Sequence, residues 1–109
     1  MLTRQDWACG RVAHMPISRA GRRAIREKRA REEFGRDAGA VLDILELTEL
    51  AWHDCYGEIT PSDAVVDDIF VVAQGSIASF GSAARLAVED FRDLRLAADD
   101  LRAEDGGPV

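Results

Sequence analysis

The sequence has little of what secreted and membrane proteins depend on. Only two cysteines, Cys9 and Cys55, occur among 109 residues, too few for a disulfide framework. No run approaches the roughly 20 apolar residues of a membrane-spanning helix, and the start "MLTRQDWACG" lacks the apolar region of a secretory signal. These absences predict one small domain in the cytoplasm, with no membrane contact and with both cysteines as thiols.

Lysine is also nearly absent: the chain has thirteen arginines and a single lysine, Lys28. This bias is typical of GC-rich genomes and indicates a high-GC bacterium or one of its phages. Residues 1–36 carry ten Arg or Lys and four acids, a net charge of +6, whereas 37–109 carry four Arg and sixteen acids, a net charge of −12. We therefore expect a basic N-terminal arm or helix within 1–36 and an acidic helical bundle domain at 37–109.

Apolar residues recur at helical spacing through most of the chain and predict an all-α fold. Three helices, at about 37–56, 61–74 and 77–104, are expected to form a three-helix bundle core. An additional basic helix at about 19–34 has few apolar residues, so we expect it to be attached loosely. The segment 61–74 is rich in strand-forming residues, which leaves a strand as the alternative there.

Side chains that favour helix ends support these boundaries. Ser18, Thr60 and Ser76 are the expected N-caps, and a glycine follows each of the helices expected at 19–34, 37–56 and 61–74. In the helix expected at 61–74, Asp67 and Asp68 are expected to face solvent, opposite the apolar positions.

The segment 77–104 carries the clearest pattern, with apolar residues at alternating steps of three and four. It predicts one continuous helix of roughly 40 Å, longer than its neighbours. The stripe is a seam that packs either against the other helices or against a second copy, so a homo-oligomer is expected. The seam residues are Ile77, Phe80, Ala84, Ala87, Phe91, Leu94, Ala98 and Leu101.

The stretch 50–63, "LAWHDCYGEITPSD", collects side chains that are common in active sites. On a helix, His53 and Cys55 point about 200° apart, so they do not converge on one substrate or ion. We interpret the stretch as a helix end, with Cys55 as a buried thiol and Trp52 and Tyr56 as an aromatic pair in the core. No catalytic residue, metal or cofactor is therefore predicted.

A zinc module or small metal-dependent enzyme is the alternative from another class. Cys9, His14, His53 and Cys55 match the ligand number of a tetrahedral zinc site. Such a site requires the helix to unwind before His53.

The basic segment "RAGRRAIREKRAR" is the feature most suggestive of function, and it has two interpretations. Its cations suit phosphate groups, which predicts a nucleic-acid-binding regulator, although the segment has no aromatic platform for bases. Alternatively, it binds acidic groups, either those of the final helix of this chain or those of a protein partner. We expect a non-enzymatic protein that acts through protein–protein contact, as an oligomer or in a larger assembly. The candidate binding residues are Arg19, Arg22, Arg23, Arg26, Lys28, Arg29 and Arg31.

Overall fold

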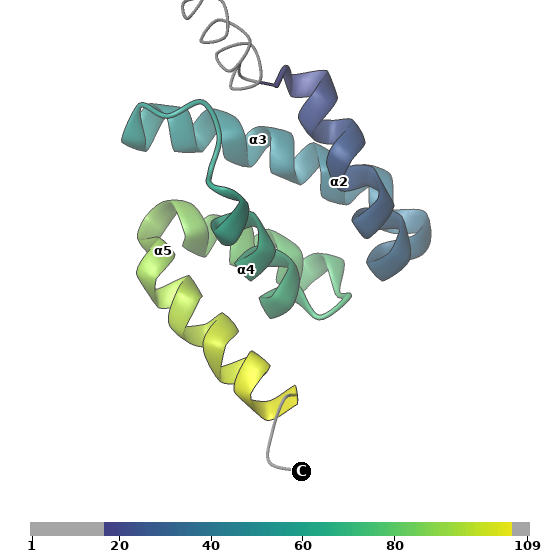
Figure 1. Cartoon of the computed structure of the whole chain (residues 1–109), viewed down its shortest axis with the longest axis vertical. Coiled ribbons are helices and arrows are strands. Elements are labelled where there is room, and N and C mark those ends of the chain that lie inside the picture. Colours follow the sequence, from purple (N-terminus) through teal and green to yellow (C-terminus); the bar gives the residue numbers. More distant parts are fainter. Residues whose placement is uncertain (1–16, 106–109) are drawn as a thin grey trace, which may run out of the picture.

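Helices make up nearly all of residues 17–105, the part of the chain that the structure, a computed structural model, describes. These residues contain no strand, which confirms the all-α prediction and makes the strand alternative wrong. None of the described helices is long and apolar enough to cross a membrane. The elements are α2 (Arg19–Phe34), the 3-10 helix η1 (Gly35–Asp37), α3 (Ala38–Tyr56), α4 (Asp63–Ala73) and α5 (Ile77–Asp105) (Figure 1).

The helix ends follow the expected side chains with one exception. The hydroxyls of Ser18 and Ser76 accept hydrogen bonds from backbone amides of the first turns of α2 and α5. The prediction of Thr60 as an N-cap is wrong, because α4 begins later and Ser62 Oγ accepts from Val65 N at 3.3 Å. Thr60 is instead engaged by side chains of α2 and α3.

The core joins α2, α3, α4 and α5, and so includes the basic helix. Phe34 of α2 packs edge-on against Phe80 of α5 at a ring-centroid distance of 5.4 Å, and Phe70 of α4 lies 5.1 Å from Phe80. Ala30 is also fully buried. The expectation of a loosely attached basic helix is therefore wrong, because the last turns of α2 contribute apolar side chains to the same core.

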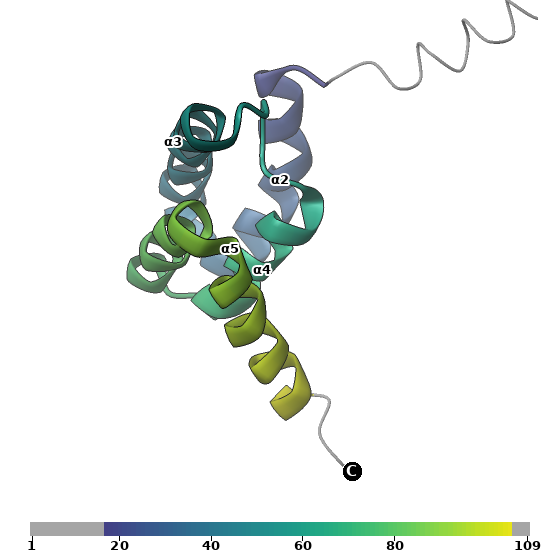
Figure 2. The same cartoon turned by 90° about the vertical axis from the view of Figure 1, so that its left-hand side faces the viewer.

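The longest helix is not continuous. Asp90 has extended backbone angles (φ −161°, ψ 89°), and it divides α5 into two helical halves, 77–89 and 91–105. Its Oδ1 accepts hydrogen bonds from the amides of Arg92 (3.1 Å) and Asp93 (3.3 Å), so Asp90 is the N-cap of the second half. Figures 1 and 2 show the second half turning away from α3 and running past α4. The prediction of one continuous helix is wrong.

Most residues of the predicted seam lie in the core of the single chain, on both sides of the break at Asp90. Phe80, Ala84 and Ala87 before Asp90, and Leu94 and Ala98 after it, are all buried. The other seam residues are less covered, since Ile77 and Leu101 are half-buried and Phe91 is 37% exposed. Most of the stripe therefore lies inside one chain.

Candidate functional site

The basic residues of α2 are mostly paired with carboxylates of this chain. Arg22, Arg23, Arg26 and Arg29 bind acids of α2, α3 or α4, and Arg31 pairs with Glu27 one turn back. Among the predicted binding residues, Arg19 and Lys28 are exposed and lie nine positions apart, on opposite sides of the helix.

The best-formed cluster surrounds Glu49 of α3, whose side chain is 3% exposed. Arg22 donates to both carboxylate oxygens, from Nε at 2.5 Å and from Nη2 at 3.0 Å. Arg26 Nη1 and the Thr60 hydroxyl donate to Oε2 at 3.0 and 2.8 Å. These four residues, the Glu49 cluster, join α2, α3 and the loop before α4.

Electrostatics hold the Glu49 cluster in its ionised form. Burial by itself raises the pKa of Glu49, but the hydrogen bonds from Arg22 and Thr60 and the charge of Arg26 outweigh it, so the pKa is lowered. The hydrogen bond to Glu49 raises the pKa of Arg22. The single Glu49 carboxylate is thus held ionised between two guanidinium groups.

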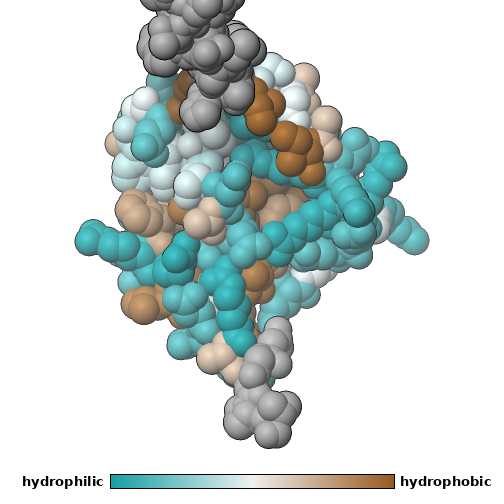
Figure 3. All heavy atoms as spheres, viewed as in Figure 1, coloured by the Kyte–Doolittle hydropathy of each residue, from teal (hydrophilic) through white to brown (hydrophobic). Residues whose placement is uncertain are grey.

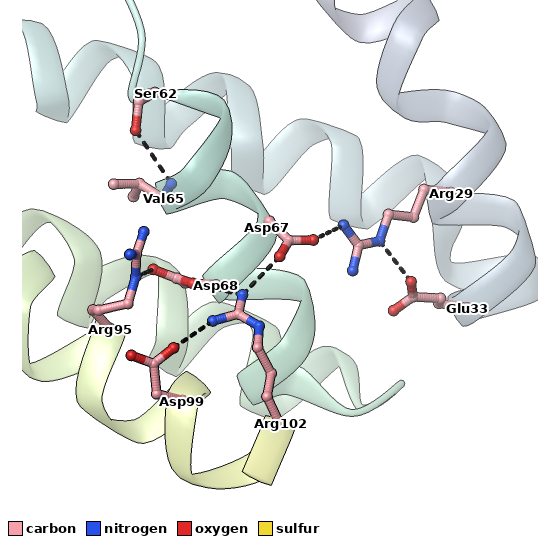
Figure 4. Close-up of polar contacts among 9 residues, drawn as sticks. All are labelled: Arg29, Glu33, Ser62, Val65, Asp67, Asp68, Arg95, Asp99 and Arg102. Atoms are coloured by element: carbon pink, nitrogen blue, oxygen red, sulfur yellow. Dashed lines mark hydrogen bonds and ion pairs between the residues drawn. The ribbon is translucent and has the colours of Figure 1, made fainter. Parts of the chain in front are cut away.

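A second cluster connects α4 to α5 and to α2 (Figure 4). Asp68, 1% exposed, accepts from Arg95 Nε and Arg102 Nη2, each at 2.7 Å. Arg102 Nη2 also donates to Asp67 Oδ2 at 2.6 Å, and Arg29 of α2 donates to the other oxygen of Asp67. The prediction that Asp68 faces solvent is wrong, because two arginines of α5 cover it.

The same hydrogen bonds shift the charged groups of this second cluster. Burial raises the pKa of Asp67, but the hydrogen bonds from Arg29 and Arg102 outweigh it and the pKa is lowered. The hydrogen bond to Asp68 is the main cause of the raised pKa of Arg102. The guanidinium of Arg29 also lies over the Phe70 ring, 4.5 Å from its centroid, which ties the cluster to the core.

The pairing of basic and acidic residues within the chain occurs, but with other partners than expected. Arg23 binds Asp43 and Glu46 on the exposed side of α3. The acids of α5 that were expected to bind the arginines of α2 form ion pairs within α5 instead: Glu89 pairs with Arg85, and Asp99 with Arg102. The carboxylates that receive α2 belong to α3 and α4.

A hollow of about 260 Å³ opens between the N-terminal half of α2 and the loop after α3. Three isoleucines line it, and each is more than half exposed: Ile17 51%, Ile25 65% and Ile59 56%. Polar side chains complete its lining, among them Arg22 and Arg26 of the Glu49 cluster. Figure 3 shows apolar surface beside α2, bordered by hydrophilic side chains. We call this feature the isoleucine hollow.

The stretch 50–63 is a helix end, as interpreted, but two details differ. The rings of Trp52 and Tyr56 are in tilted contact with centroids 4.3 Å apart, yet only Trp52 is buried, and Tyr56 is 39% exposed. Cys55 is exposed, so the prediction of a buried thiol is wrong. His53 is exposed as well. Since Cys55 and His53 remain on one unbroken helix, the unwinding that a zinc site requires is not seen.

No group of three or more metal-ligating side chains occurs within residues 17–104. Cys9 and His14, the other two residues of the alternative zinc site, lie outside the described residues. In the described part, every buried side-chain nitrogen and oxygen has a hydrogen-bond partner.

The sequence could have revealed part of these clusters. Asp68 follows Val65 by three residues and precedes Ile69 by one, at the edge of the buried stripe of α4. Arg95 and Arg102 are seven apart, which places them on one face of α5. The pairing of these two faces depends on the turn of α5 at Asp90, for which the apolar pattern gave no sign.

Comparisons with known proteins give no relative: no family model, curated protein or solved structure matches this chain. Its function is therefore inferred from its own residues.

Proposed function

We propose that this chain is a small cytoplasmic, non-enzymatic protein that acts by binding another protein. The observation that carries this proposal is the isoleucine hollow, where Ile17, Ile25 and Ile59 present apolar surface inside a polar rim. Exposed apolar patches bordered by polar residues are typical of protein-interaction sites. The hollow suits one or two apolar side chains of a partner.

The walls of the hollow are held before any partner arrives. Arg22 Nη1 donates to the carbonyl oxygen of Ile17 at 2.5 Å, while the same guanidinium binds Glu49. On the opposite side, Trp52 Nε1 donates to Glu58 at 2.9 Å, directly before Ile59. A preorganised site loses less conformational entropy on binding, which favours affinity.

The charge pairing favours a protein over a nucleic acid as the partner. A surface that binds phosphates needs adjacent cations whose counterions are released on binding. Five of the seven candidate cations already face carboxylates of this chain. The exposed thiol of Cys55 fits a reducing compartment, in agreement with a cytoplasmic protein.

The test is co-purification from the native host at moderate salt, with the tagged wild-type chain and two variants. Ile25→Ser removes apolar surface from the hollow, and Leu47→Ser is its matched control, because both side chains are 65% exposed and Leu47 is not part of the hollow. We expect a protein that the wild type and Leu47→Ser retain and that Ile25→Ser loses.

Two results contradict the proposal. One is a protein that all three chains retain equally, because its binding surface then lies outside the hollow. The other is nucleic acid, detected as a raised ultraviolet 260/280 absorbance ratio that falls at high salt, which supports the alternative of a nucleic-acid-binding regulator.

A further inference from the structure

A second exposed surface lies on the outer half of α5. Arg92, Leu96 and Asp100 follow one another at intervals of four residues, so they form one ridge along the helix. The side chain of Arg92 is 85% exposed, Leu96 is 64% exposed and Asp100 is exposed. The ridge therefore carries a positive, an apolar and a negative group in that order, and we call it the α5 ridge.

The charges of the α5 ridge are not committed to strong pairs within the chain. The carboxylate nearest to Arg92 is that of Asp90, at 4.0 Å, and it already caps the helix. Arg102, the arginine closest to Asp100 in sequence, binds Asp99 and the acids of α4 instead. Both ends of the ridge can therefore bind a partner.

An apolar hollow of about 450 Å³ lies beside the ridge. Val65, Phe91 and Leu96 supply its apolar walls, and Phe91 is itself 37% exposed. Figure 3 shows an apolar patch over this part of α5, surrounded by hydrophilic atoms. The remaining lining residues are Ser62, Asp68, Arg92 and Arg95.

The order of charges makes the ridge complementary to itself. We propose that two copies of this chain associate through the α5 ridge, antiparallel, about a two-fold axis beside Leu96. Leu96 then meets its counterpart and reaches the apolar hollow of the second copy. Arg92 of each chain faces Asp100 of the other, so two ion pairs flank the apolar contact.

Helix geometry permits this arrangement. When ridges of four-residue spacing on two helices run side by side, the helix axes cross at about 50°. Under that crossing the two α5 ridges run in opposite directions along one line, which aligns residue 92 with residue 100. A parallel pairing is disfavoured, since it brings Arg92 against Arg92 and Asp100 against Asp100.

The α5 ridge shares no residue with the isoleucine hollow. Its test is therefore independent of the proposed function: loss of self-association leaves partner binding standing, and the reverse holds as well.

The proposal is tested by sedimentation of the full chain at tens of micromolar, using charge reversal. Arg92→Asp gives a ridge with two negative ends, and Asp100→Arg gives one with two positive ends. We expect the wild type to dimerise and each reversed chain alone to associate at least about tenfold more weakly. An equimolar mixture of the two reversed chains should again form a dimer.

Arg85→Asp is the matched control, because Arg85 is also highly exposed, at 80%, but lies on the first half of α5. It should dimerise like the wild type, and unchanged circular dichroism shows that each variant is folded. A wild type that is strictly monomeric overturns the proposal. So do reversed chains that dimerise as the wild type does, or a mixture that stays monomeric.

Discussion

Replacement of Glu49 by glutamine tests whether the Glu49 cluster stabilises the fold. Glutamine keeps the size of the side chain and one oxygen acceptor, so it leaves no cavity. It removes the negative charge that faces two guanidinium groups whose side chains are only 13% and 11% exposed. Removing one partner of a buried ion pair leaves an uncompensated charge, which typically costs about 3–5 kcal/mol.

We expect Glu49→Gln to lower the free energy of unfolding by about 3 kcal/mol, the lower end of that range, because Arg22 and Arg26 retain some access to water. For a domain of this size, this loss lowers Tm by about 12–24 °C. Urea unfolding followed by far-ultraviolet circular dichroism measures the loss, and an unchanged m-value shows that the two states compared are the same.

Glu46→Gln is the matched control on the same helix. It breaks the pair with Arg23, in which both side chains are about one-third exposed, and exposed pairs contribute about 0–1 kcal/mol. Equal losses for Glu46→Gln and Glu49→Gln would refute the reasoning, because burial would then not separate the two pairs.

Three further predictions concern pH and the helix ends. The pKa values of Glu49 and Asp67 are lowered in the fold, so the stability they contribute is complete above their unfolded values, about 4.3 and 3.9. Urea titrations should show this contribution being lost as the pH falls below those values. A free energy of unfolding that increases as the pH falls through that range would contradict the prediction. Asp90→Ala removes the N-cap of the second half of α5 and should cost about 1 kcal/mol. Hydrogen exchange should become faster at the amides of Arg92 and Asp93, with the exposed Asp93→Ala as control. Gly57→Ala should cost about 1–2 kcal/mol through backbone strain alone, because φ is +75° and nothing lies within 4 Å of an added Cβ. A loss near zero in thermal unfolding would show that the turn relaxes.

The helices were predictable because local signals agree at their ends. Ser18 and Ser76 act as caps by a hydrogen bond three residues on, and Gly57 adopts the left-handed backbone that ends α3. Such contacts lie within one turn, so the sequence displays them directly. Thr60 failed as a cap because its hydroxyl has a competing partner in Glu49, eleven residues away in sequence.

The break in α5 and the burial of Asp68 were not predictable from periodicity. The apolar spacing continues across Asp90, and an aspartate between charged residues reads as part of a solvated helix face. Whether such a residue is buried depends on which helix lies opposite. Arg95 and Arg102 reach Asp68 only after the chain has turned at Asp90.

The isoleucine hollow was not predictable from the sequence either, because it forms only when separate segments pack together. Ile17 and Ile25 lie just before and within α2, whereas Ile59 belongs to the loop after α3, and none of them continues a strong apolar stripe. Only the packing of that loop against α2 brings Ile59 to the other two. Long-range pairings of this kind need the tertiary arrangement, which a single sequence does not display.

The contact of Phe34 with Phe70 and Phe80 has a consequence for the order in which the chain folds. α4 and α5 are separated by the short turn 74–76, so the entropy lost in bringing Phe70 to Phe80 is small. Phe34 must close a much longer loop to reach the same rings. We therefore expect the α4–α5 hairpin to form first and α2 to dock late, which brings Phe34 to the other two rings. Interactions that form after the transition state mainly slow unfolding, so we expect the contacts of α2 to determine how slowly the folded chain unfolds.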